Sequence, residues 1–113
     1  MSETIVKVPK AESKILKSKF CGNKNVKEIY LPQTVLYIDK SAFRDCISLE
    51  KINLPPNVCY IHEETFKGCI ALKEIVLPES ITAIPSALFK NCSSLKSITI
   101  PKYTVPHIPA TSD

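Results

Sequence analysis

The side chains with the greatest chemical capability in this sequence are five cysteines and two histidines. Cys46, Cys69 and Cys92 follow one another at intervals of 23 residues, whereas Cys21 and Cys59 stand outside the apolar pattern. Three thiols at one recurring place could hold a metal ion or take part in redox chemistry. No Cys-x-x-Cys pair is present and no histidine shares the spacing, so we expect three buried, unreactive thiols that fill a core.

The two histidines do not complete a catalytic or metal site. His62 and His107 are 45 residues apart in the chain. Cys59 lies close to His62, but no group that would orient the histidine or stabilise an oxyanion accompanies this pair. The only two glycines, Gly22 and Gly68, are too far apart to share a phosphate-binding loop. We therefore expect no catalytic residue, no metal ligand and no cofactor, and hence a protein that is not an enzyme.

The ends and composition of the chain bear on its location. Its first residues, MSETIVKVPK, lack the basic start and the apolar stretch of a signal peptide. No apolar run approaches the roughly 18 residues that a transmembrane helix needs. An odd number of cysteines favours a reducing compartment. These features predict a cytoplasmic protein without a membrane span, and the alternative is the cell surface if the chain is a fragment.

A repeat with a period of 23 residues runs through nearly the whole chain. Phenylalanine occurs at this interval and nowhere else, at Phe20, Phe43, Phe66 and Phe89. We number each copy from its Phe as position 1. Apolar residues then recur at positions 7, 10, 12, 16 and 19, cysteine recurs at position 4 and proline at position 13. The apolar pattern stops at His107.

Each copy has the pattern of one short strand followed by a return. Positions 10 and 12 alternate with polar residues, as in a strand with one buried face. Proline at position 13 ends the strand, positions 16 and 19 point inward again, and positions 20 to 23 suit a helical turn. One copy cannot bury its own apolar side chains, so neighbouring copies must stack. We expect stacked phenylalanines in the core and parallel strands over 28–31, 51–54, 74–77 and 97–100.

The pattern L-x-x-I-x-L-P-x-x-V-x-x-I-x-x-x-A-F-x-x-C, clearest over 42–61, resembles that of the BspA-like leucine-rich repeat family. The resemblance covers about residues 4–107. It implies an α/β leucine-rich-repeat solenoid, β-dominated, with parallel strands on the concave face and short helical turns and return strands elsewhere. It also implies a protein-binding or adhesive role, such as that of a surface antigen.

The repeat predicts a single domain over 1–113. A proline-rich tail, which we expect to fray, occupies 108–113. The rest of the domain consists of a partial copy at 4–19 and four copies at 20–42, 43–65, 66–88 and 89–107.

Binding is predicted on the concave face, which should carry positions 8, 9 and 11. Charges at positions 8 and 9 alternate in sign between the first three copies, so they should neutralise one another. The uncharged, varied position 11 is the better binding candidate, because tyrosine is a frequent interface anchor. We predict a non-enzymatic protein-binding module with a protein partner of unknown identity. Its candidate binding residues are Tyr30, Asn53, Val76 and Thr99 at position 11, and Lys51 and Ser97 at position 9.

Two other functions stay open. The alternative is a structural unit that self-assembles through the solenoid ends, as a weak homo-oligomer. It should pair mainly at the C-terminal end, where Ile98 and Ile100 border an open strand edge. The distant alternative is binding to an acidic surface or nucleic acid through the lysine-rich residues 1–27, which offer no aromatic platform before Lys19.

The face opposite the predicted binding face carries a further apolar group. It forms either a second exposed patch or a cover for the return strand. Its members, at positions 17 and 18, are Leu36, Tyr37, Cys59 and Tyr60.

Overall fold

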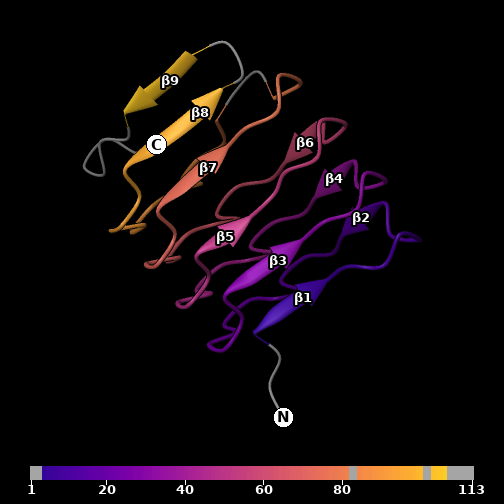
Figure 1. Ribbon diagram of the computed structural model, residues 1–113, viewed down its shortest axis with the longest axis horizontal. Coiled ribbons are helices and arrows are strands. Elements are labelled where there is room, and N and C mark those ends of the chain that lie inside the picture. The colour runs from indigo at the N-terminus through magenta and orange to yellow at the C-terminus, as the bar shows by residue number, and fades with distance from the viewer. Residues whose placement is uncertain (1–3, 82–83, 101–102, 107–113) are drawn as a thin grey trace.

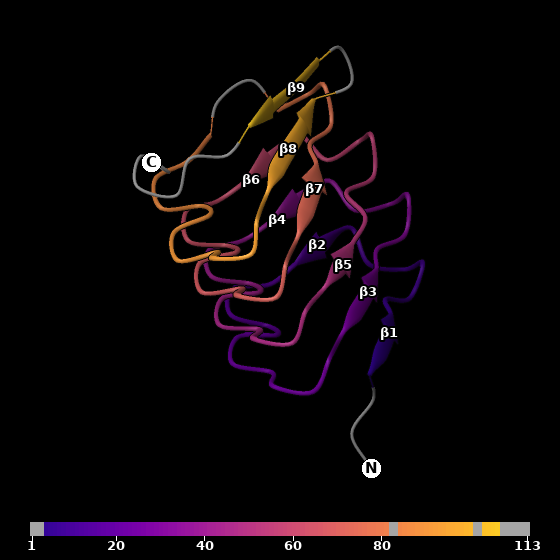
Figure 2. The ribbon, with the colours of Figure 1, turned by 60° about the vertical axis from the view of Figure 1, so that its left-hand side comes forward.

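The computed structural model describes residues 4–81, 84–100 and 103–106, which form a solenoid of about four turns (Figure 1). One strand per turn lies on the same side, and we call these the front strands: β1 (Ile5–Lys7), β3 (Glu28–Tyr30), β5 (Lys51–Ile52), β7 (Glu74–Val76) and β8 (Ser97–Ile100). Three return strands lie on another side: β2 (Lys14–Ile15), β4 (Tyr37–Ile38) and β6 (Tyr60–Ile61) (Figure 2). The predicted β-dominated solenoid with parallel strands is confirmed.

The strands pair in the register that the 23-residue period predicts. Ile5 lies opposite Glu28, Glu28 opposite Lys51, and Glu74 opposite Ser97. Hydrogen bonding divides the front strands into two ladders, one of β1, β3 and β5 and one that contains β7 and β8. β5 and β7 nevertheless lie side by side, and β2, β4 and β6 form a third ladder, the return sheet.

One phenylalanine per turn stacks along the core, as the repeat predicted. The ring centroids of Phe20 and Phe43 are 5.5 Å apart, those of Phe43 and Phe66 5.5 Å, and those of Phe66 and Phe89 5.9 Å. The last three rings are fully buried, whereas Phe20 is half-buried at the first turn. The stack of rings joins the turns because each ring is covered by the next.

The helical turns expected at positions 20 to 23 are hydrogen-bonded turns instead. The described part of the chain contains no helix, and therefore none long and apolar enough to cross a membrane. The backbone N–H groups of Phe43 and Asp45 donate to Thr65 and Lys67 of the next turn, at 3.0 and 2.8 Å. Because these donors point along the solenoid, they are not available for the bonds within one segment that a helix needs.

Left-handed backbone explains why these turns do not continue into helices. Position 3 has a positive φ in every copy, at Gly22, Asp45, Gly68 and Asn91. Position 22 has one as well, with φ between 56° and 59°, at Ser18, Ser41, Glu64 and Ala87. A residue in this region interrupts a right-handed helix, so each copy turns two corners within a few residues.

The C-terminal edge of the front strands is covered, contrary to the prediction of an open edge there. β9 (Tyr103–Pro106) pairs antiparallel with β8, and Ile98 lies opposite Val105. The chain turns back after β8 and forms β9 instead of another parallel strand. The β8 edge, on which the prediction of dimerisation rested, is therefore paired within the chain. The tail at 108–113 and His107 lie outside the described residues.

The third copy departs from the repeat at position 19. Ile38 and Ile61 are buried there, as predicted, but Ile84 is 42% exposed, so the prediction was wrong at this residue. Leu88, four residues later, is fully buried at a position where the earlier copies have the smaller Ala42 and Thr65. We infer that this larger side chain takes up core volume in the third copy, since interiors are close-packed.

Candidate protein-binding surface

The outward side of the front strands, which we call the strand face, carries positions 9 and 11. Successive side chains of a strand point to opposite faces. Position 10 is accordingly buried, at Ile29, Ile52 and Ile75, so its neighbours face solvent. All six predicted binding residues lie in or beside the front strands, and the period therefore brings them to one surface.

Tyr30 and Val76 are the two most hydrophobic side chains at position 11 of the four full copies. Val76 is 55% exposed, and Tyr30 is half-buried. The Tyr30 hydroxyl donates a hydrogen bond to the carboxylate of Glu28 on the same strand. This hydrogen bond is the main cause that raises the pKa of Tyr30, because only the protonated hydroxyl can donate it. Tyr30 is thus held by Glu28 with its ring on the strand face.

Asn53, the next residue at position 11, makes structural hydrogen bonds. Its Oδ1 accepts from the backbone N–H of Leu31 at 2.7 Å, and its Nδ2 donates to the Leu31 carbonyl at 3.0 Å. The side chain thereby makes bonds between neighbouring turns that a backbone ladder would otherwise supply. We did not foresee this role from the sequence, although asparagine is a poor strand former and its place at position 11 was a signal.

Five charged side chains line a depression of about 490 Å³ on the strand face, and four of them are exposed. Glu50 and Lys51 come from one turn and Lys73 and Glu74 from the next, and all four are exposed. The remaining lining residues are Glu28, Ile52, Ile75 and Val76.

The predicted neutralisation of these charges is not realised as ion pairs. Glu28 and Lys51 are register partners, yet the Glu28 carboxylate binds the Tyr30 hydroxyl instead. Among the residues that the structure describes, the ion pairs gather at the turns, around Arg44, Glu64 and Lys67 and between Lys40 and Glu63. The four exposed charges Glu50, Lys51, Lys73 and Glu74 are in none of these ion pairs and therefore remain available to a partner.

The three stacked cysteines are buried, whereas Cys21 and Cys59 are exposed, as predicted. Each buried sulfur lies 3.0–3.1 Å from a Phe carbonyl oxygen of the preceding turn, so the thiol donates a hydrogen bond between turns. Burial raises the pKa of Cys46 to about 12 and that of Cys92 to about 11, and it raises that of Cys69 as well. The thiols are therefore protonated donors and not nucleophiles.

With this geometry in place, comparison with known proteins identifies the repeat. A family model described as a BspA type leucine rich repeat region (6 copies) matches residues 4–111. The chain belongs to this family. A search of curated proteins found no match.

Three solved structures of leucine-rich repeat proteins are similar to this chain. The pneumococcal vaccine antigen PcpA superposes with a TM-score of 0.82 and 31% identity, over 87% of this chain and 24% of its own. The T. pallidum leucine-rich repeat protein TpLRR superposes with a TM-score of 0.78 and 29% identity, over 81% of this chain and 45% of its own. A leucine rich cell surface protein of Faecalibacterium prausnitzii shares the fold, with a TM-score of 0.65 and 24% identity, over 88% of this chain and 32% of its own. The chain thus spans less than half the length of each.

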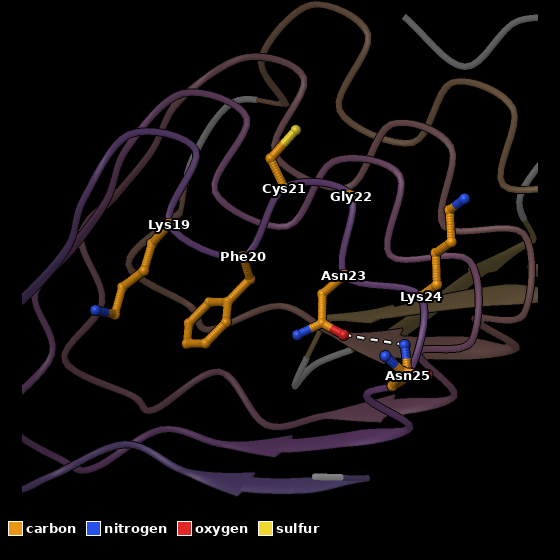
Figure 3. A pocket seen from close by; sticks show the side chains of 7 residues that line it. All are labelled: Lys19, Phe20, Cys21, Gly22, Asn23, Lys24 and Asn25. Atoms are coloured by element: carbon orange, nitrogen blue, oxygen red, sulfur yellow. Dashed lines mark hydrogen bonds between the residues drawn. The ribbon is translucent and has the colours of Figure 1, made fainter. Parts of the chain in front are cut away.

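Residues 19–25, at the junction of the partial copy and the first full copy of the BspA-type solenoid, line a polar hollow of about 420 Å³ (Figure 3). Asn23 stands where later copies have cysteine, and its Oδ1 accepts from the backbone N–H groups of Asn25 and Val26 at 3.0 and 3.1 Å. The Phe20 ring and Asn23 point to one side of this segment, and Cys21 points to the other.

All seven lysines of residues 1–27 are exposed, at 7, 10, 14, 17, 19, 24 and 27.

In the described part of the chain, the residues considered for nucleophilic or metal chemistry have other partners. The His62 ring stacks on Tyr60 at 4.4 Å between centroids, while the Cys59 sulfur lies 3.5 Å from the Leu36 carbonyl oxygen. Within residues 4–81, 84–100 and 103–106, no three side chains of His, Cys, Asp or Glu gather as metal ligands would. His107 lies outside these ranges.

The apolar group at positions 17 and 18, on the return sheet, forms an exposed patch. Leu36, Tyr37 and Tyr60 are 37%, 44% and 52% exposed, and Cys59 is exposed too. Tyr37 and Tyr60 are register partners on β4 and β6, so their side chains lie side by side on the outer side of the return sheet. Of the two alternatives left open by the sequence, the structure favours the exposed patch.

Proposed function

We propose that this chain is a non-enzymatic protein-binding module that acts through the strand face. The observation that carries the proposal is the depression over β3, β5 and β7, in which four exposed charges have no ion-pair partner in the described structure. Charges left open on a surface give specificity and fast association more than raw affinity. The buried thiols support the non-enzymatic part, because a protonated, enclosed thiol is a poor nucleophile.

Tyr30 and Val76 are the proposed anchors at the two sides of this surface, with Lys51 between them. Thr99 and Ser97 extend it on β8, where both are half-buried. Asn53 is in the proposed contact set as well, but its amide is already bonded to Leu31. A partner therefore meets a hydrogen-bonded asparagine that does not have to rearrange.

The test compares strand-face variants with a matched variant on the return sheet. Immobilised wild-type chain captures proteins from a detergent extract of cells, and each captured protein is then purified and its Kd measured. Val76→Lys and Tyr30→Ala should weaken such a complex at least about tenfold, the cost of losing one anchor. Tyr60, on the return sheet, is 52% exposed, close to the 55% of Val76, and Tyr60→Ala should leave the Kd unchanged. Equal losses with Tyr60→Ala would overturn the proposal.

The return-sheet patch is a second candidate surface, because Tyr37 and Tyr60 present adjacent exposed rings. In that case Tyr60→Ala, and not Val76→Lys, abolishes capture. Binding through the lysines of residues 1–27 is the third candidate, and it predicts a Kd that rises steeply with salt. For location, we propose the cell surface, as for the leucine rich cell surface protein of F. prausnitzii, whose likeness to this chain is in fold.

A further inference from the structure

The charges around the depression form a square of alternating sign. Along the chain they read Glu50 and Lys51 on one turn, then Lys73 and Glu74 on the next. Within this square two positive and two negative side chains balance, so a partner that carries one sign meets as much repulsion as attraction there. Glu28, the fifth charge of the depression, accepts a hydrogen bond from Tyr30. The matching surface must itself alternate in sign, across two positions and two turns.

The spacing of this square narrows the partner further. Neighbouring strands of a sheet lie about 4.8 Å apart, whereas side chains on one side of a single extended peptide are about 6.8 Å apart. An extended peptide laid across the strands would therefore fall out of step with the turns. A second sheet, packed face to face with its strands nearly aligned, has the same spacing.

This chain itself presents such a sheet. Consider a two-fold axis that runs parallel to the strands and lies between β5 and β7. Rotation about it exchanges the two turns and keeps each repeat position in place, so Lys51 of one copy faces Glu74 of the other. Glu50 likewise faces Lys73, and symmetry doubles both contacts. The square is thus self-complementary, with four ion pairs across the interface.

We propose that two copies of this chain pair face to face through the strand face, with the two-fold axis between β5 and β7. The inference rests on the proposed function, in that it names a second copy as the partner of the same surface. The exposed Val76 lies beside the charges and faces Asn53 of the second copy. The outer turns place Lys27 opposite Lys96, which repel, and Tyr30 opposite Thr99, so the dimer is weak.

Sedimentation equilibrium of the full chain at low salt, up to high micromolar concentration, measures the association. Lys51→Glu and Glu74→Lys should each weaken it at least about tenfold, because two symmetry-related attractions become repulsions. An equimolar mixture of the two variants should associate as wild type does, since the two reversed side chains face and attract each other in the mixed dimer. High salt should dissociate the wild-type dimer.

Lys14→Glu is the matched control, because Lys14 is an exposed lysine of β2 on the return sheet and its reversal changes the net charge equally. This variant should associate as wild type does. Circular dichroism of each variant checks that the solenoid is folded.

Three outcomes would overturn the inference. A wild type that stays monomeric at low salt rejects pairing but leaves the proposed function untouched, because capture of another protein is measured separately. Dimers that persist in both single variants place the contact elsewhere. If the single variants dissociate and their mixture does not associate, this two-fold arrangement is rejected. One alternative with that result is a two-fold axis along the solenoid, which would pair Glu50 of one copy with Lys51 of the other.

Discussion

The buried cysteines act as hydrogen-bond donors between turns, and this role determines their reactivity. Cys46, Cys69 and Cys92 each donate to a Phe carbonyl oxygen of the preceding turn from a fully buried position. Cys21 and Cys59 are exposed. We expect a thiol reagent to modify two cysteines rapidly in the native protein and the other three only after denaturation. Mass spectrometry of labelled peptides measures the rate at each cysteine. Rapid labelling of the three buried cysteines in the native protein would contradict their burial in the core.

The same thiols should make the protein less stable at alkaline pH. The ordinary thiol pKa is 9.0, and in the folded protein it is raised to about 12 at Cys46 and about 11 at Cys92. Between these values the unfolded chain releases protons that the folded chain keeps, so the stabilisation present below pH 9 is lost as the pH rises. Each thiol contributes a slope of at most about 1.4 kcal/mol per pH unit.

Urea unfolding at pH 8 and at pH 10 measures this loss in wild type and in Cys92→Ala. The variant is less stable at both values, but its free energy of unfolding should fall less between them. Lysine and tyrosine titrations cancel in the comparison. Equal falls in the two proteins would show that Cys92 ionises alike in both states.

The left-handed residues at position 22 predict a stabilising substitution. Ala87 has a φ of 57°, a region in which a residue with a Cβ is strained. Ala87→Gly should raise the free energy of unfolding by about 0.5–1 kcal/mol, because the relief of strain exceeds the extra entropy of a glycine in the unfolded chain. Ala71→Gly, at a turn residue without a positive φ, should lower it by a similar amount. A loss in both variants would argue against the turn geometry.

At the scale of the elements, the ladder between turns contains side chains as well as backbone. Asn53 bonds both backbone groups of Leu31, next to the place where the front strands divide into two ladders. Asn53→Ala should lower the free energy of unfolding by about 1–3 kcal/mol, since it removes two hydrogen bonds and leaves two backbone groups without these partners. Chemical denaturation measures the change.

Val76→Ala is the control for this substitution, at the same position of the next turn. Its side chain is 55% exposed, so its truncation should change the free energy of unfolding by no more than about 0.5 kcal/mol. If both variants lose the same amount, the loss at Asn53 comes from the strand position and not from its amide.

For the whole molecule, β9 protects the C-terminal edge of the solenoid. It pairs antiparallel along the full length of β8. Removal of residues 101–113 should expose the β8 edge, lower the Tm by several degrees and cause association, because an open strand edge pairs with other chains. Thermal unfolding and light scattering measure both effects.

Removal of residues 107–113 alone is the matched truncation, because it keeps all of β9. This variant should stay as soluble as the full chain, with an unchanged Tm. A shorter truncation that is as damaging as the longer one would assign the protection to residues beyond β9.

The sequence by itself determined the features that every copy of the repeat shares. A strict 23-residue period predicts the register of the strands, the stack of phenylalanines and the burial of three cysteines. These predictions succeeded because stacked copies place equivalent residues beside one another. The six candidate binding residues come to one surface for the same reason, while their role in binding stays a prediction.

Only the tertiary structure decided the features that depend on a single neighbour or on local backbone geometry. Glu28 accepts a hydrogen bond from Tyr30 instead of pairing with Lys51, and the repeat period does not predict this choice of partner. The left-handed φ of Ala87 has no signal in a residue type that ordinarily avoids it. The return of β9 onto β8 likewise depends on an edge that becomes available only when the turns have stacked. Repetition specifies the common frame, and individual contacts in the folded chain specify the departures from it.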